Sequence, residues 1–165
     1  MKTVKPVLFF ALISTVIISG CVKEKDFPTT PVIGFKAYYA YSNDSADCVI
    51  TFKDGDGDIG ILPDDTVSQN DYKLKYLYKD TTDGQFKPFD AIPGTPAMDT
   101  LFYSYRVPNL TPEGQYKALD GEILAKLRAA PIYYPLHHTV KFEIQLRDRA
   151  GHLSNRVLTS EIHIP

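Results

Sequence analysis

The sequence has no tryptophan and only two cysteines, Cys21 and Cys48. Cys21 ends an apolar N-terminal run, so Cys48 is left without an intrachain partner and a disulfide-stapled scaffold is excluded. Cys48 stands in a strand-like stretch with no basic partner nearby, and we expect it to be a small, buried apolar residue. Lysine and arginine form no basic stripe and the formal net charge is −2, which argues against nucleic acid as a partner.

The N-terminal residues predict a signal peptide. Lys2 and Lys5 form a short positive region, and residues 7–18 are almost uninterrupted apolar sequence. As a helix this run would be about 18 Å long at about 1.5 Å per residue, well short of the roughly 30 Å hydrocarbon core of a membrane. The run therefore suits the apolar part of a cleaved signal better than a permanent membrane span.

The end of the run, Ile18-Ser19-Gly20-Cys21, is similar to the lipobox of bacterial lipoproteins, which usually has leucine where this chain has Ile18. The pattern predicts that residues 1–20 are removed and that Cys21 carries two or three acyl chains, palmitate among them, enough for stable membrane attachment. An ordinary secretory signal with an incidental cysteine is the alternative. Residues 21–31 are charged and then Pro/Thr-rich, which is typical of a flexible tether. Val22 follows the cysteine at the position where an aspartate would retain a lipoprotein in the inner membrane. The outer membrane is therefore favoured, on either its periplasmic or its outer face.

Residues 32–165 predict one all-β domain, because apolar and polar residues alternate in segments separated by turn residues. The apolar residues within 111–129 could form one face of a helix, but Asp120-Gly121 interrupts that pattern. A loop followed by a strand is therefore favoured. The order of segments predicts an immunoglobulin-like antiparallel β-sandwich of seven or eight strands, with a small β-barrel as the alternative. The expected strands are 32–41, 48–52, 72–78, 85–89, 101–107, 122–128, 139–147 and 156–164.

One acidic loop carries the clearest chemistry. Asp54, Asp56 and Asp58 alternate with Gly55 and Gly57, and clustered carboxylates on a flexible backbone suit Ca²⁺, which takes six to eight oxygen ligands. Without a cation the three charges would repel one another. The alternative is that the Asp-Gly pairs only form tight turns.

The loop is not an EF-hand, although it begins like one. Ile59 occupies the position of the sharp-turn glycine, Asp65 occupies that of the bidentate glutamate, and a strand precedes the loop. The motif from Phe52 to Gly60, taken with residues 146–155 (LRDRAGHLSN), resembles small lipoproteins of Bacteroidota. That resemblance implies an immunoglobulin-like fold and no known activity.

The topology of such a sandwich adds a fourth candidate ligand. The acidic loop would join the second and third strands, and residues 148–155 would join the last two, so both loops would lie at the same end. Asp148 could then complete a site with Asp54, Asp56 and Asp58. We expect bound Ca²⁺ to act as a structural ion, with a dissociation constant on the order of 10⁻⁴–10⁻³ M.

No catalytic motif stands out, and we expect no enzymatic activity. A GxSxG elbow is absent, and the spacing of Glu113, Glu122 and Glu143 does not place two carboxylates across a cleft, so a hydrolase is a remote alternative. His137-His138 lacks a third metal ligand nearby. The expected role is binding, adhesion or assembly at the cell envelope, with a protein or glycan partner. The alternative of a glycan-binding accessory lipoprotein depends on a set of tyrosines: Tyr38, Tyr39, Tyr41, Tyr103, Tyr105, Tyr133 and Tyr134.

Overall fold

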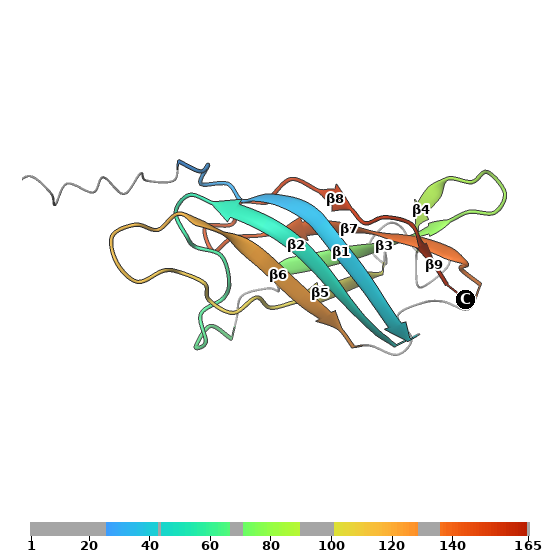
Figure 1. The fold of residues 1–165 in the computed structure, drawn as a ribbon, viewed down its shortest axis with the longest axis horizontal. Coiled ribbons are helices and arrows are strands. Elements are labelled where there is room, and N and C mark those ends of the chain that lie inside the picture. Colours follow the sequence, from blue (N-terminus) through green and yellow to red (C-terminus); the bar gives the residue numbers. More distant parts are fainter. Residues whose placement is uncertain (1–25, 43, 67–70, 90–100, 129–135, 165) are drawn as a thin grey trace, which may run out of the picture.

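The computed structural model describes residues 26–42, 44–66, 71–89, 101–128 and 136–164 (Figure 1). The expected signal peptide, Cys21 and the first part of the tether lie outside these residues. Every regular element that is described is a β-strand. Within the described residues there is no helix long and apolar enough to span a membrane.

The first sheet has three antiparallel strands. They are β1 (Val32–Ser42), β2 (Ser45–Asp54) and β6 (Leu119–Leu127), in the order β1-β2-β6. Strand β2 is central and pairs with β6 along nearly its full length, from Ala46 opposite Leu127 to Asp54 opposite Leu119. The described part of the ambiguous segment, residues 111–128, is therefore a loop followed by a strand, as expected.

The second sheet is built around the antiparallel pair β3 (Tyr72–Lys79) and β7 (Thr139–Leu146). Two short strands, β4 (Phe86–Pro88) and β5 (Phe102–Tyr105), lie one after the other along the free edge of β3. On the other side, β8 (Val157–Leu158) and β9 (Ile162–His163) share the outer edge of β7.

The expected strand 156–164 is thus divided into two short strands. Thr159 lies between them, and its hydroxyl accepts a 3.0 Å hydrogen bond from the amide of Phe142, while its own amide donates to the carbonyl of Phe142 at 3.0 Å. This side chain replaces a backbone acceptor in the ladder, so the regular pairing stops on either side of it.

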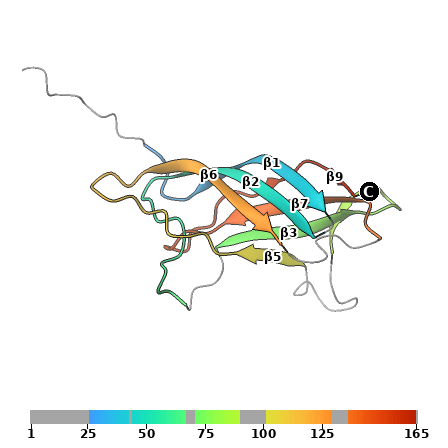
Figure 2. The ribbon, with the colours of Figure 1, turned by 60° about the horizontal axis from the view of Figure 1, so that its bottom comes forward.

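The two sheets pack face to face as an open antiparallel β-sandwich, which confirms the predicted fold class (Figures 1 and 2). Alternate residues supply the core, as a half-buried strand requires. The buried face of β2 includes Cys48 and Ile50, and that of β7 includes Phe142 and Ile144. Burying a side chain such as Phe142 contributes about 1.5–3 kcal/mol to the free energy of unfolding.

The strands of the described residues occupy seven positions, three in the first sheet and four in the second, because β4 with β5 and β8 with β9 each share one position. In a constant-type immunoglobulin domain the fourth strand belongs to the first sheet. Here β4 and β5 pair with β3 in the second sheet instead. The loops after β2 and β7 meet at one end, close to the start of β1.

Candidate functional site

The acidic loop begins where β2 ends, since Asp54 is the last residue of that strand. The amide of Asp58 donates a 3.0 Å hydrogen bond to Oδ2 of Asp54, which folds the loop back on itself. As a result Asp54, Asp56 and Asp58 each offer a carboxylate oxygen within 4.8 Å of the other two. Asp54 is buried, Asp58 is partly buried and Asp56 is exposed, so the group opens to solvent on one side.

Two oxygens of this group are buried without a hydrogen-bond partner among the described residues. They are Oδ1 of Asp54 and Oδ1 of Asp58. Burial raises the pKa of Asp54 to about 6, and the negative charges of Asp56 and Asp58 add to the shift. A buried acceptor that is left unpaired costs about 1–3 kcal/mol, so these oxygens are suited to a cation that would neutralise them.

Glycine is required in the loop because other backbone segments approach it closely. Gly57 has φ of 67°, and a Cβ atom there would lie 2.1 Å from the carbonyl oxygen of Lys117. A Cβ atom on Gly55 would lie 2.2 Å from the carbonyl oxygen of Phe27. The glycines were expected to let the loop curl, and the structure adds that they admit two neighbouring segments.

The N-terminal segment Asp26–Pro31, assigned to the tether from the sequence, is in contact with this loop. The amide of Gly55 donates a 2.9 Å hydrogen bond to the carbonyl of Pro28. The ammonium of Lys53 lies 5.5 Å from the centre of the Phe27 ring, a cation–π contact. The chain therefore joins the sandwich beside the acidic loop, ahead of β1.

The loop after β7 is bound to the acidic loop, as the sandwich topology predicts. The amide of Ala150 donates to Oδ2 of Asp58 at 2.9 Å, and the amide of Arg149 donates to the Asp58 carbonyl at 3.2 Å. The guanidinium of Arg149 also donates to the carbonyl of Gly60 at 2.7 Å and to Oδ1 of Asn109 at 2.8 Å. It donates as well to the carbonyl of Ile59 at 3.3 Å and to the hydroxyl of Thr111.

Asp148, the fourth expected ligand, lies at this junction but is oriented into its own turn. Its Oδ1 accepts a 2.7 Å hydrogen bond from the amide of His152, and its Oδ2 lies 2.9 Å from Nδ1 of His152. The group within ligand distance contains Asp54, Asp56 and Asp58 only, among the described residues. The charge of Asp148 still acts on Asp58 and helps to raise its pKa, after the larger effect of burial.

Asn155 is a site residue that sequence reasoning missed. Its side-chain oxygen accepts from the amide of Ile33 at 2.8 Å, and its side-chain amide donates to the Ile33 carbonyl at 2.9 Å. The side chain therefore pairs with β1 as another strand would. The only sequence signal is its place at the end of the LRDRAGHLSN motif.

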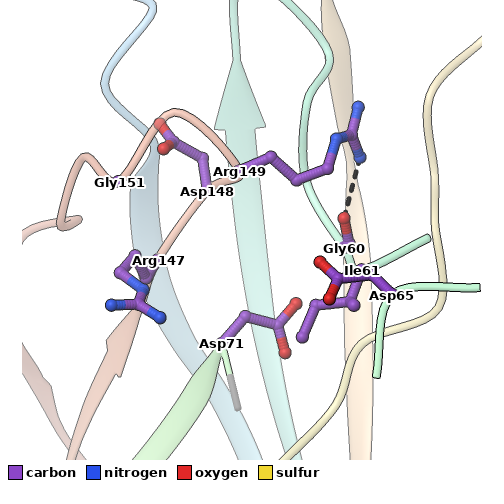
Figure 3. Close-up of a pocket in the computed structure, with 8 residues that line it drawn as sticks. All are labelled: Gly60, Ile61, Asp65, Asp71, Arg147, Asp148, Arg149 and Gly151. Atoms are coloured by element: carbon purple, nitrogen blue, oxygen red, sulfur yellow. Dashed lines mark hydrogen bonds between the residues drawn. The ribbon is translucent and has the colours of Figure 1, made fainter. Parts of the chain in front are cut away.

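A polar cavity of about 410 Å³ lies between the two loops and the start of β3 (Figure 3). Its walls include Gly60, Ile61, Asp71, Arg147, Asp148 and Arg149. Asp71 is only 4% exposed, and its Oδ1 accepts a 2.8 Å hydrogen bond from the amide of Val107. Its Oδ2 is buried without a hydrogen-bond partner among the described residues, and burial raises the pKa of this carboxyl. Sequence reasoning did not single out Asp71 or Arg147.

The tyrosines considered as a glycan platform are divided between core and surface. Tyr38 stacks on Phe142 with ring centroids 5.6 Å apart, and Tyr103 and Tyr105 are partly buried against the core. Tyr39 and Tyr41 are exposed, at 53% and 63%. Tyr133 and Tyr134 lie outside the described residues.

The remaining candidates for catalysis or metal binding lie apart from one another. Glu122 pairs with Lys36 on the first sheet, Glu143 pairs with Arg156 on the second, and Glu113 is exposed in a loop. His137 packs among aromatic rings of the second sheet, and its neighbour His138 is exposed.

The chain matches no protein-family model, no curated protein and no solved structure. Similarity to known proteins therefore gives no indication of what this chain does. The chemistry of the site follows from its own residues, which are a three-carboxylate group and a polar cavity beneath it.

Proposed function

We propose that this chain is a lipid-anchored protein of the cell envelope whose β-sandwich binds Ca²⁺ at Asp54, Asp56 and Asp58. The observation that carries the metal site is the pair of buried oxygens, Oδ1 of Asp54 and Oδ1 of Asp58, that have no hydrogen-bond partner among the described residues. Both belong to carboxylates that converge within 4.8 Å. A cation at this point would satisfy both oxygens and remove the repulsion between the three charges.

The donor set favours calcium among the common cations. All three side chains offer hard carboxylate oxygens, and no cysteine or histidine belongs to the group in the described part of the chain. Zinc and copper select nitrogen and sulfur ligands, and Mg²⁺ requires a nearly ideal octahedron. Calcium accepts irregular sets of oxygen ligands from side chains, backbone and water, as a glycine-rich loop can supply.

The ion would have a structural role at the end of the sandwich. It would fix the acidic loop, which contacts residues 27–28, the loop before β6 and the loop after β7. A rigid end of this kind suits a non-catalytic module for binding, adhesion or assembly, since binding surfaces depend on loops held by a scaffold. The lipobox-like end of the apolar run supports membrane attachment through Cys21.

Thermal unfolding tests the calcium site. We expect a saturating concentration of Ca²⁺ to raise the Tm above its value in EGTA, by several degrees, because a ligand at a hundred times its Kd adds about 2.7 kcal/mol to the free energy of unfolding. Asp54→Asn should abolish the response. Asp64→Asn is the matched control, because Asp64 is exposed in the same loop outside the three-carboxylate group. Equal midpoints in Ca²⁺ and EGTA would reject the site.

Mass spectrometry tests the anchor. We expect the N-terminal peptide of the native protein to begin at Cys21 and to carry acyl chains, and Cys21→Ser to abolish both acylation and cleavage at this position. An unmodified N-terminal residue on the native protein would reject lipid anchoring. That result would leave the calcium site untouched, because the two features are measured separately.

A further inference from the structure

The cavity between the acidic loop and the loop after β7 is lined by two opposite charges, Asp71 and Arg147, that form no ion pair with each other. We propose that it binds a small zwitterion, an amino acid or the end of a short peptide, with the ligand ammonium on Asp71 and the ligand carboxylate on Arg147. Its volume of about 410 Å³ lies in the range of small-molecule sites, roughly 300–1,000 Å³. The proposal does not depend on calcium binding.

Asp71 supplies the site for the ammonium. Its side chain is 4% exposed and is held by the Val107 amide on Oδ1, which leaves Oδ2 buried without a partner among the described residues. In Figure 3 its carboxylate lies between Arg147 on one side and Ile61 and Asp65 on the other. A buried carboxylate oxygen without a donor is unfavourable, and a ligand ammonium would provide a charge-assisted hydrogen bond.

Arg147 supplies the site for the carboxylate. It directly follows β7, and its amide donates a 2.8 Å hydrogen bond to the carbonyl of Asp71, so the two backbones are fixed against each other. Its guanidinium makes no ion pair within 4.0 Å with any described acidic group, Asp71 included. Arginine remains charged at all ordinary pH values, and its planar fork matches a carboxylate.

The other charged groups of the wall are Asp65, Asp148 and Arg149, and each is already engaged by the protein. Asp148 accepts twice from His152, and the guanidinium of Arg149 bonds the carbonyls of Ile59 and Gly60. Asp71, on which the charge of Arg106 also acts, and Arg147 are therefore the pair left for a ligand, one charge of each sign.

Two other ligand classes fit less well. The described residues contain one group of carboxylates close enough to share a metal ion, and it does not include Asp71. Arg147 would also repel a cation from this cavity. A sugar ring usually stacks on an aromatic side chain, and no aromatic residue lines these walls among the described residues.

Heteronuclear NMR titration of the mature protein tests the proposal, with the proteinogenic L-amino acids and diglycine as individual probes at millimolar concentration. We expect at least one probe to shift the amides of Gly60, Ile61 and Gly151, which line the cavity. Ethylammonium and acetate, which each carry half of the zwitterion, should bind at least about tenfold more weakly. Each titration is run in Ca²⁺ and in EGTA, so a failure of the calcium site is recognised separately.

Two variants test which residue binds each charge of the ligand. Asp71→Asn retains an acceptor for the Val107 amide and replaces the free oxygen with a donor, so it should weaken binding about tenfold or more while the fold persists. Arg147→Gln, at a partly exposed side chain, should do the same. Lys126→Gln is the control, because Lys126 is an exposed cation of β6 that lines neither this cavity nor the adjoining pocket that contains Asp71 and Arg147. Absence of shifts with every probe, unchanged affinity in both variants, or equal binding of ethylammonium alone would overturn the proposal.

Discussion

The amide of Ala150 donates a 2.9 Å hydrogen bond to Oδ2 of Asp58 across 92 residues of sequence. One oxygen of Asp58 is thereby held by the loop after β7, and its other oxygen, Oδ1, is buried with no hydrogen-bond partner in the described part of the chain. The backbone of Arg149 adds a second contact to the carbonyl of the same aspartate. The position of a candidate metal ligand is therefore set by the second sheet as well as by its own loop.

Arg149→Lys should destabilise this junction. The guanidinium bonds the carbonyl of Gly60, Oδ1 of Asn109 and the hydroxyl of Thr111, and a lysine ammonium cannot reproduce that fork. We expect a loss of about 1 kcal/mol or more in the free energy of unfolding, measured by urea denaturation in EGTA. Calcium affinity should fall as well, because the loop that carries Asp58 is held less firmly.

Arg156→Lys is the control for that measurement. Its guanidinium is exposed and forms an ion pair with Glu143 at 3.4 Å. We expect a change within about 0.5 kcal/mol, as is usual for a surface ion pair. Equal effects of the two substitutions would contradict the specific role of Arg149.

Gly55→Ala should release the N-terminal segment from the sandwich. A Cβ atom would lie 2.2 Å from the carbonyl oxygen of Phe27, and the clash involves backbone, which cannot rotate away. We expect residues 26–31 to lose protection in hydrogen exchange, and the amide at position 55 to exchange faster, because its bond to Pro28 is lost.

Gly84→Ala is the control that separates a clash with Phe27 from general backbone strain. Gly84 has φ of 72°, but a Cβ atom there would meet nothing within 4 Å. The substitution should reduce global stability and leave residues 26–31 as protected as before. Retained protection of those residues in Gly55→Ala would show that the contact is not required for docking.

The sheet pattern was predictable because it depends on alternation within single strands. In β7 the apolar side chains of Val140, Phe142, Ile144 and Leu146 all face the core, as the sequence indicates. The pairing partners of the edge strands were not predictable in this way. The last expected strand is divided because the hydroxyl of Thr159 takes the place of a backbone acceptor. The alternation of apolar and polar residues gives no sign of such a hydrogen bond.

The candidate site was predictable where its residues are adjacent in sequence. The grouping of Asp54, Asp56 and Asp58 follows from their spacing, and the meeting of the two loops follows from the topology. The orientation of the Asp148 carboxylate could not be predicted from the sequence, because both of its oxygens are bound by His152 within a local turn. Asp71 was missed because an aspartate before a strand ordinarily belongs to an exposed turn, and only tertiary packing buries it.

The thiol of Cys48 should be unreactive in the folded protein. It is fully buried, accepts a 3.7 Å hydrogen bond from the hydroxyl of Tyr72, and burial raises its pKa to about 11. Only the thiolate is nucleophilic, so an alkylating reagent near neutral pH should label Cys48 only after unfolding. Mass spectrometry of a polypeptide beginning at Val22, with and without urea, measures this. Labelling under native conditions at the urea rate would contradict the buried position.

His137 should make stability depend on pH below neutrality. Its ring stacks on Tyr78 with centroids 4.4 Å apart, and Nδ1 lies 3.1 Å from the hydroxyl of Tyr76. Desolvation by burial lowers the pKa of His137 below its ordinary value of 6.5. The unfolded chain therefore binds the proton more readily, and the contribution of His137 to stability falls as the pH drops through about 6.5 toward the folded pKa.

His137→Phe isolates this effect, because it keeps a flat ring against Tyr78 and Phe89 and removes the titrating group. The buried carboxyls have raised pKa values and act in the opposite direction, since they bind protons more readily in the folded state, but they are the same in both proteins. The difference in free energy of unfolding between His137→Phe and the parent should therefore grow as the pH is lowered from about 7.5 to about 5.5. A difference that stays constant over that range would mean that the imidazole is protonated equally easily in the folded and unfolded chains, and that its aromatic surroundings do not exclude the charge.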